Sequence, residues 1–213
     1  MDECIVVDGG SSDTTVKIAE ELGFTVLTTD KGRGAQCNMG AEYASSSLLI
    51  FLHADTLLPP DFPNLITTCL TQPETILGAF SLRIEPGNVR LRMIAAGANF
   101  RSRYLRLPYG DQTLFMRNSD FNACGGFPEI PILEDYVFIR EVKKRGQIET
   151  LRQTVITSAR RWQKLGAIRT TVSNQLMILG YHIGIPLEKL ASFYRNGLFF
   201  RKLGGNKGSD TIG

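Results

Sequence analysis

Two aspartates that directly follow apolar runs are the residues of this chain best placed to do chemistry. Asp8 ends a β-branched run and precedes Gly9 and a serine turn, and Asp55 follows the apolar run 48–52 together with His53. An apolar strand that ends in an acidic residue and a flexible turn presents that residue to a ligand at the edge of an α/β sheet. The two carboxylates therefore predict a polar, metal-assisted site.

The segment 8–13 suits a nucleoside. The carboxylates of Asp8 and Asp13 can accept hydrogen bonds from a base or a ribose, and Gly9 lets a ligand approach the backbone. Asp13 also stands where the cap of the following helix would stand, so both interpretations remain open. The segment lacks the G-x-G-x-x-G pattern, which argues against a dinucleotide-dependent oxidoreductase.

One histidine and three carboxylates suit catalysis or metal binding: His53, Asp55, Glu134 and Asp135. His53 and Asp55 are alternate residues at a strand end, so both side chains can point the same way. Asp55 suits Mg²⁺, which uses few protein carboxylates when it bridges a diphosphate; capping of the turn before Pro59 is the alternative. Glu134 and Asp135 start a helix after a glycine loop. A carboxylate there could act as a general base, although acidic residues also stabilise a helix start through its dipole.

Arginines supply the opposite charge. Arg33 lies in a Lys-Gly-Arg-Gly loop that opens a helix, where cations suit phosphate oxygens. Arg160 and Arg161 precede Trp162, the only tryptophan. The guanidinium groups could neutralise a departing diphosphate, and the indole could stack on a sugar or a base. Packing of Trp162 beneath the sheet is the alternative.

Hydrophobic periodicity predicts the elements that must hold these residues. Strands alternate with helices of about ten residues up to residue 84, which indicates crossover units and a three-layer α/β fold whose sheet is mainly parallel. The predicted strands are 4–7, 25–28, 48–52, 78–84, 113–117 and 148–156, the last of which would close the sheet. The predicted helices are 13–22, 34–45, 61–71, 88–103 and 134–145, followed by two C-terminal helices, one through Leu165 and Leu179 and one opened by Pro186.

Length and composition restrict the classes of protein. The 213 residues suffice for one sizeable domain, and no apolar run reaches the roughly 20 residues that cross a bilayer. The acidic start does not resemble a signal peptide, and the four scattered cysteines are typical of reduced thiols in a cytoplasmic protein. Residues 1–139 hold 10 Lys and Arg against 17 Asp and Glu, whereas residues 140–213 hold 14 against 4. The basic C-terminal third suits phosphates or anionic lipid, or its helices are simply solvated.

Six short motifs occur in an order that one known family shares. They are Val-Val-Asp-Gly-Gly-Ser-Ser-Asp at 6–13, Gly-Arg-Gly-Ala-Gln-Cys-Asn-Met-Gly at 32–40, His-Ala-Asp at 53–55, Gly-Gly-Phe at 125–127, Glu-Asp at 134–135 and Arg-Arg-Trp at 160–162. Together they resemble the inverting family-2 glycosyltransferases of the GT-A fold. Tyr-Gly-Asp-Gln at 109–112 and the loop Gly-Gly-Phe-Pro-Glu-Ile-Pro are similar to those of a small bacterial subgroup.

The resemblance implies transfer of a hexose from a nucleotide-sugar donor to a hydroxyl acceptor, with inversion. Asp135 would be the catalytic base, supported by Glu134, and Asp55 would hold a Mg²⁺ or Mn²⁺ ion. The implied nucleotide-binding residues are Asp8, Gly9, Asp13 and Arg33. The residues implied to lie near the donor diphosphate or the acceptor are His53, Asp111, Gly126, Arg161 and Trp162.

The sequence departs from the family pattern in two places. His53 replaces the first acid of the family's Asp-x-Asp, which weakens the expected contact with the ribose. The resemblance also implies an interior strand ahead of the one at 4–7, whereas this chain starts directly at the strand that would come second. We therefore expect unpaired backbone groups on both neighbouring strands, or a gap that altered pairing or another copy of the chain fills.

The same analysis predicts three segments and leaves two other functions open. We expect a nucleotide-sugar-binding catalytic domain over 1–159, a helical extension over 160–203 and a flexible tail over 204–213. Residues 187–202 mix aromatic side chains with Lys and Arg, which suits an anionic membrane surface or packing against the domain or a second subunit. We expect a cytoplasmic protein, at most peripheral to a membrane, with no nucleic-acid partner. The alternatives are a nucleotidyltransferase of similar architecture and a catalytically silent nucleotide-binding or scaffold protein.

Overall fold

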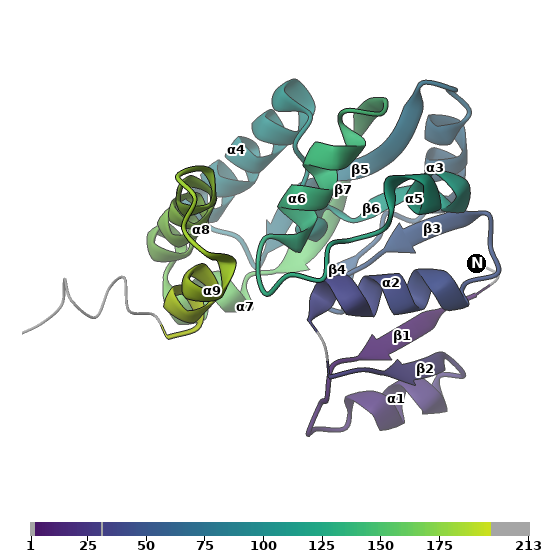
Figure 1. The fold of residues 1–213 in the computed structure, drawn as a ribbon, viewed down its shortest axis with the longest axis horizontal. Coiled ribbons are helices and arrows are strands. Elements are labelled where there is room, and N and C mark those ends of the chain that lie inside the picture. The colour runs from purple at the N-terminus through teal and green to yellow at the C-terminus, as the bar shows by residue number, and fades with distance from the viewer. Residues whose placement is uncertain (1–2, 31, 197–213) are drawn as a thin grey trace, which may run out of the picture.

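The computed structural model describes residues 3–30 and 32–196, which form an α/β fold of sheet and helices (Figure 1). The strands are β1 (Ile5–Asp8), β2 (Thr25–Thr28), β3 (Leu48–Phe51), β4 (Thr56–Leu57), β5 (Thr75–Glu85), β6 (Leu114–Arg117) and β7 (Gln147–Ser158). The helices are α1 (Thr15–Glu21), α2 (Arg33–Tyr43), α3 (Phe62–Leu70), α4 (Val89–Leu105), α5 (Asn118–Cys124), α6 (Glu134–Val142), α7 (Arg160–Leu165), α8 (Ala167–His182) and α9 (Leu187–Asn196), with a 3-10 turn η1 (Gly110–Gln112).

Every strand and helix predicted from periodicity is present, with shifts of a few residues at the ends. The structure adds β4, α5 and α7, which the sequence did not predict. These elements have two, seven and six residues. Two turns of helix or fewer are too short for an apolar repeat to stand out, so periodicity cannot detect them.

The strands form two groups. β1 and β2 pair in parallel, and the other five form a sheet in the order β3-β6-β5-β7-β4. Within that sheet β5 and β7 are parallel, whereas β6 runs antiparallel to β3 and β5, and β4 runs antiparallel to β7. The larger sheet is therefore mixed, its longest pairing, between β5 and β7, is parallel, and β4, not β7, forms its edge. Periodicity reports the burial of a strand and says nothing about its direction.

β1 and β3 each have an open edge within the described part of the chain. β1 pairs with β2 alone and β3 pairs with β6 alone. Because a parallel ladder bonds through every second residue, Ile5 and Val7 direct their backbone groups away from β2. Gln36 of α2 donates to the Val7 oxygen at 3.2 Å. The expected unpaired edges are thus found and no altered pairing joins them; filling by another copy of the chain stays a prediction.

Two apolar clusters hold the larger sheet between layers of helices. One cluster packs α2, α5 and α6 against one face, through residues such as Leu77, Met116 and Phe138. The other packs α3 and α4 against the opposite face, through residues such as Ile66 and Phe115. β6 shows the reason: Leu114 and Met116 face the first cluster and Phe115 the second. The three-layer α/β arrangement is confirmed (Figure 1).

α7, α8 and α9 follow β7. They correspond to the helical extension predicted over 160–203 as far as residue 196, while the predicted tail 204–213 lies outside the described residues. α8 and α9 share a small apolar cluster with Ile132, which lies just ahead of α6. A domain boundary at 159 stays a prediction. None of the helices in the described ranges is long and apolar enough to span a membrane.

Candidate functional site

Five segment ends approach one another beside the larger sheet. They are the turn after β3, which carries His53 and Asp55, the start of α2, the turn η1, the start of α6 and the start of α7. Helix starts carry unpaired N–H groups and the positive end of the helix dipole, so α2 and α6 favour an anion here. The local sequence supports each start, since Gly32 is the N-cap of α2 and Glu134 and Asp135 occupy the first turn of α6.

Asp135 is half-buried and held by two backbone donors. The Gly110 N–H donates to Oδ2 at 3.0 Å, and the Tyr136 N–H donates to Oδ1 at 2.7 Å. A Cβ atom at Gly110 would lie 3.1 Å from His53 Nε2 and 3.5 Å from Asp135 Oδ2. The imidazole and the carboxylate therefore both adjoin this glycine. Two residues that are far apart in the sequence thus meet at Gly110.

Asp111 places a carboxyl inside the protein next to Gly110. Its Oδ1 is buried and has no hydrogen-bond partner among the described residues. Burial raises the pKa of this carboxyl, and the nearby Arg101 guanidinium opposes the shift. Further charged groups that act on it are Asp135, His53 and Arg161. An orphaned buried carboxyl that faces several charged side chains is typical of a functional site.

Gln112 fixes the turn that carries Asp111. Its fully buried side chain donates to the Phe80 oxygen of β5 and to Ser102 Oγ of α4, both at 3.0 Å. Arg101 donates to Gln112 Oε1 at 3.3 Å, and its Cζ lies 3.4 Å from the centre of the Tyr109 ring. The turn is therefore tied to the core from two sides. Burial raises the pKa of Tyr109 to about 12, so its hydroxyl stays protonated at neutral pH.

Two non-glycine residues beside the site have a left-handed backbone. Thr113 has φ 53° directly after η1, and Leu133 has φ 67° directly before α6. Such conformations cost on the order of 1–3 kcal/mol and persist only where the surrounding packing over-determines them. They set the directions in which Asp111 and Asp135 leave the chain. Two of the three described non-glycine residues with a positive φ thus lie beside these carboxyl groups, and the third, Arg106, ends α4.

Arg33 and Glu134 form an ion pair between α2 and α6. Arg33 Nε lies 2.7 Å from Glu134 Oε1, and the Glu134 side chain is buried while that of Arg33 is more than half exposed. Burial raises the pKa of Glu134, and Arg33 opposes the shift. The pair fixes the start of α2 against the start of α6. Glu134 therefore positions Arg33.

An open hollow of about 440 Å³ lies over this cluster. Its lining residues are Arg33, His53, Ala54, Asp55, Ser158 and Arg160. Arg161 adjoins it, because Asp55 and Asp111 both act on its charge. Burial lowers the pKa of Arg161, Arg33 lowers it further, and the two carboxylates oppose the shift. The hollow therefore combines cationic groups with an exposed carboxylate.

The predicted nucleoside residues lie at the C-terminal end of β1, on the smaller sheet. The Gly10 and Ser11 N–H groups donate to Asp8 Oδ2 at 2.8 Å, and hydrogen bonds from Ser11 are the main reason that the pKa of Asp8 is lowered. Asp13 accepts from the Thr15 N–H at 3.0 Å at the start of α1, as a capping residue does. No contact among the described residues joins Asp8 or Asp13 to the cluster around the hollow.

Gly9 connects the two regions through α2. A Cβ atom at this position would lie 2.5 Å from Gln36 Nε2, so the turn after β1 rests on the side of the helix that starts with Arg33. The sequence predicts that Asp8, Asp55 and Asp135 share one cleft. The structure places His53, two residues before Asp55, beside Asp135 at Gly110, and it places Asp8 on the neighbouring strand group, reached along α2; a single cleft for the three aspartates stays a prediction.

Gly126 and Trp162 have structural contacts. Gly126 has φ 72°, and the adjacent Phe127 exchanges two 2.8 Å hydrogen bonds with the Asn38 side chain of α2. A Cβ at Gly126 would lie 2.8 Å from Asn38 Oδ1, so only glycine fits. Trp162 is partly buried against the cluster between α3, α4 and the sheet. The packing alternative for Trp162 therefore describes its contacts.

A metal ion would find one carboxylate in the hollow. In the ranges 3–30 and 32–196, no three His, Cys, Asp or Glu side chains converge on one point. Asp55 is an exposed carboxylate on the wall of the hollow. Mg²⁺ usually binds one or two protein carboxylates together with substrate phosphates. Asp55 thus fits a cation that a diphosphate also coordinates.

Sequence reasoning missed Arg101 as a site residue and did not single out Gln112 as the anchor of η1. Both lie within or just before the Tyr-Gly-Asp-Gln segment that carried part of the resemblance. Arg101 is one of four arginines of α4, and its spacing did not distinguish it from the other three. The contact with Tyr109 and the proximity to Asp111 arise only when η1 folds back on α4.

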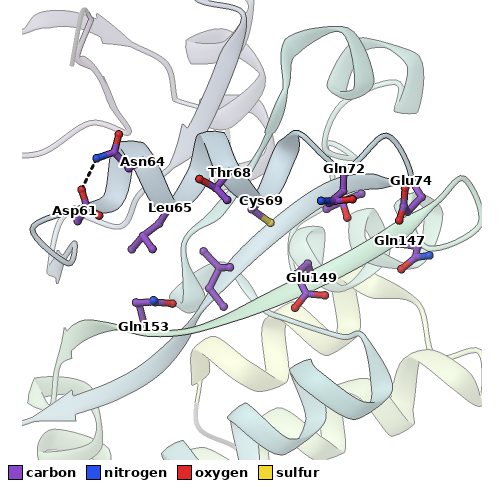
Figure 2. A pocket seen from close by; sticks show the side chains of 12 residues that line it. Asp61, Asn64, Leu65, Thr68, Cys69, Gln72, Glu74, Gln147, Glu149 and Gln153 are labelled. Atoms are coloured by element: carbon purple, nitrogen blue, oxygen red, sulfur yellow. Dashed lines mark hydrogen bonds between the residues drawn. The ribbon is translucent and has the colours of Figure 1, made fainter.

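A second hollow of about 420 Å³ lies on the other side of the sheet, between α3 and β7 (Figure 2). α3 contributes polar residues one turn apart, such as Asn64 and Thr68, and β7 contributes the alternate residues Gln147, Glu149 and Gln153. Its described lining contains amides, hydroxyls and carboxylates but neither Lys nor Arg.

Comparison with known families identifies the chain. The family described as Glycosyl transferase family 2 matches residues 1–127, more than half of the sequence. The chain belongs to glycosyl transferase family 2. The matched region includes Asp8, Arg33, His53, Asp55 and Asp111 and ends before α6.

Individual relatives agree with this family. A 4,4'-diaponeurosporenoate glycosyltransferase of Staphylococcus haemolyticus is 42% identical over 64 residues, which are 26% of this chain and 17% of that protein. S. aureus TarS matches with a TM-score of 0.57 and 15% identity over 82% of this chain and 34% of TarS. The mannosyltransferase PcManGT from Pyrobaculum calidifontis, solved with GDP-Man and Mn²⁺, matches with a TM-score of 0.63 and 16% identity over 82% of this chain and 52% of that one. At this identity the likeness shows the fold, which is the expected GT-A fold.

Proposed function

We propose that this family-2 chain transfers a hexose from a nucleotide-sugar donor to a hydroxyl acceptor, with inversion at the anomeric carbon. The observation that carries the proposal is the meeting of Asp135, His53 and Asp111 around Gly110, beside a hollow lined by arginines and Asp55. TarS binds UDP-GlcNAc and PcManGT binds GDP-Man in their solved complexes, which supports a nucleotide-sugar donor here.

Asp135 acts as the general base in this proposal. Its carboxylate is half-buried, and each of its oxygens accepts one backbone N–H, so its orientation is set before a substrate arrives. Each carboxylate oxygen has two lone pairs. The lone pair that does not accept the backbone N–H can take the proton of an acceptor hydroxyl. The hydroxyl oxygen then bonds to the anomeric carbon as the bond to the nucleoside diphosphate breaks on the opposite face. Attack from that side inverts the configuration.

The cationic groups bind the donor diphosphate. Arg33 and Arg160 line the hollow and Arg161 adjoins it, so their charge is in place to offset the charge that develops on the leaving diphosphate. A Mg²⁺ or Mn²⁺ ion held by Asp55 would add to this charge when bound; Mn²⁺ in the PcManGT complex supports that assignment. Asp8, Gly9 and Asp13 bind the nucleoside on the far side of α2.

We also propose that the protein works in the cytoplasm. All four cysteines, of which Cys69 and Cys124 are buried, are free thiols, which supports the reducing cytoplasm as its location.

The acceptor side is formed by η1 and α6. We propose that a hydroxyl compound binds there against Tyr109 and Tyr136, whose rings pack edge to face.

Release of nucleoside diphosphate from a panel of UDP- and GDP-sugars, with Mg²⁺ or Mn²⁺ present, tests the proposal. Release from at least one donor is expected, and Asp135→Asn is expected to lower the rate about 10²- to 10⁴-fold. Asp61→Asn, an exposed aspartate in the second hollow, is the matched control and should leave the rate unchanged. Calorimetric binding of UDP or GDP without any turnover would instead support a catalytically silent nucleotide-binding protein.

A further inference from the structure

α4 and α8 present apolar side chains to solvent on the faces that point away from the core. On α4 the exposed row consists of Val89, Met93, Phe100 and Tyr104. On α8 it consists of Ile168, Val172 and Leu179, and Ile183 at the C-cap continues it. Met93 is 70% exposed and Ile168 67%. The members of each row are four or seven residues apart, so they form one stripe along the helix.

The core-facing sides of both helices are occupied as well. Leu91 and Ala95 of α4 are buried in the cluster against the sheet, and Met177 and Gly180 of α8 are buried beside α9. With roughly 100° per residue, Leu91, Ala95 and Met177 lie roughly opposite the exposed rows, and Gly180 lies about a quarter of a turn away. Both helices are therefore apolar on two sides, which a helix at a plain solvated surface is not. A second apolar environment is needed to account for the outer rows.

The charge around the rows identifies that environment. α4 carries four arginines, α7 two arginines and a lysine, and α8 one arginine, and none of the three helices contains Asp or Glu. Arg90, Arg92 and Arg103 are exposed on α4 and flank its apolar row on both sides. Apolar residues between flanking arginines are the pattern of a helix that lies in the plane of an anionic lipid surface.

The exposed rows make up one candidate surface on two helices that are neighbours in the fold. α4 and α8 are in contact, and both lie at the left of the molecule in Figure 1, away from the β1–β2 pair. α7 connects β7 to this surface, and α4 leads through residues 106–109 into η1, which carries Asp111. The surface therefore adjoins the acceptor side of the site.

We propose that the outer faces of α4 and α8 bind the surface of an anionic membrane. A second copy of the chain fits less well, because two such faces would bring their arginines together without any carboxylate to offset the charge. Residues 197–213 fit less well for the same reason, since they contain three Lys and Arg against one Asp. This membrane surface differs from the one predicted over 187–202, part of which lies outside the described residues.

Sedimentation with lipid vesicles tests the proposal on the whole chain. Vesicles of phosphatidylcholine with about 30% phosphatidylglycerol should retain the protein at low salt, and pure phosphatidylcholine or high salt should release it. The double variant Met93→Glu, Ile168→Glu should weaken retention about tenfold or more, because each change places a carboxylate on the lipid-facing row. Leu22→Glu at the C-cap of α1, where the leucine is 63% exposed, is the control and should be retained like the wild type.

Two further measurements make the outcome decisive. Thermal unfolding of the double variant should match the wild type, because both substituted side chains are exposed; undiminished retention of this folded variant would overturn the proposal. Analytical ultracentrifugation without lipid should show the same species for both proteins, and a dimer that the double variant abolishes would overturn it in favour of self-association. Vesicle binding is measured without a sugar donor, so its failure would leave the proposed sugar transfer untouched.

Discussion

The two hollows of this molecule are almost equal in volume, at about 440 and 420 Å³, but differ in what converges on them. The first lies where the starts of α2, α6 and α7 meet a strand end, and arginines, a histidine and carboxylates act on one another there. The second lies between α3 and β7, and its described lining has carboxylates, amides and hydroxyls but no Lys or Arg to oppose the acids (Figure 2). The volume of a hollow therefore does not identify the functional site. Opposite charges at helix starts do identify it, because such a cluster can bind and release an anion.

The largest effect that separates the two hollows is expected at Asp55. Asp55→Asn should lower donor turnover about 10²-fold, because it removes the one carboxylate of the described lining, which is proposed to hold a cation together with the donor diphosphate. The Mn²⁺ concentration that gives half of the maximal rate should rise at the same time. Steady-state kinetics at several Mn²⁺ concentrations measure both quantities, and an unchanged metal dependence would remove Asp55 from the metal site.

A smaller effect is expected at Arg161. Arg161→Ala should raise the donor KM about tenfold, since a hydrogen bond to a charged group contributes on the order of 1.5–3 kcal/mol. Arg152→Ala, an exposed arginine on β7, is the matched control and should not change KM. If both variants behave alike, net charge and not the position of Arg161 would explain donor binding.

Asp111 should show a conflict between stability and function. Its buried Oδ1 lacks a partner and burial raises the pKa of the carboxyl, so the folded state binds a proton more readily than the unfolded state. Wild-type stability therefore falls as the pH rises above about 4 and through the raised pKa. Asp111→Asn removes this loss, and its Tm should exceed that of the wild type at pH 8 by about 2–4 °C.

The difference in Tm should shrink as the pH approaches about 4, because the wild-type carboxyl is then protonated in both states. Calorimetric scans between pH 4 and 8 measure it. A constant difference across this range would show that titration of Asp111 is not its cause. Donor turnover measured on the same variant should fall, since Asp111 faces Asp135 and Arg161.

The smallest effect is expected in the second hollow. The double variant Glu149→Gln, Gln153→Ala changes two residues of its β7 wall and should leave donor turnover within about twofold of the wild type. The rate assay used for Asp55 measures it directly. A loss comparable to that of Asp55→Asn would mean that the second hollow takes part in the reaction, and the contrast between the two regions would be lost.

Much of the site was predictable because its residues follow strand ends or start helices. Asp55 and His53 come directly after β3, and Glu134 and Asp135 start α6, as the patterns predicted. The division of the strands was less predictable. Asp8 ends β1 as expected, yet β1 and β2 stand apart from the five other strands, because pairing depends on neighbours that are distant in the sequence.

Local patterns in the sequence determined most elements of this protein, the reduced cysteines and the chemical types of the site residues, since periodicity, capping and side-chain chemistry depend on nearby residues. Tertiary structure alone decided the mixed direction of the sheet, the contacts of Arg101 with η1 and the burial of Asp111. It also decided that the apolar rows of α4 and α8 face outward. These features depend on which distant surfaces pack together, and no short segment of sequence contains that information.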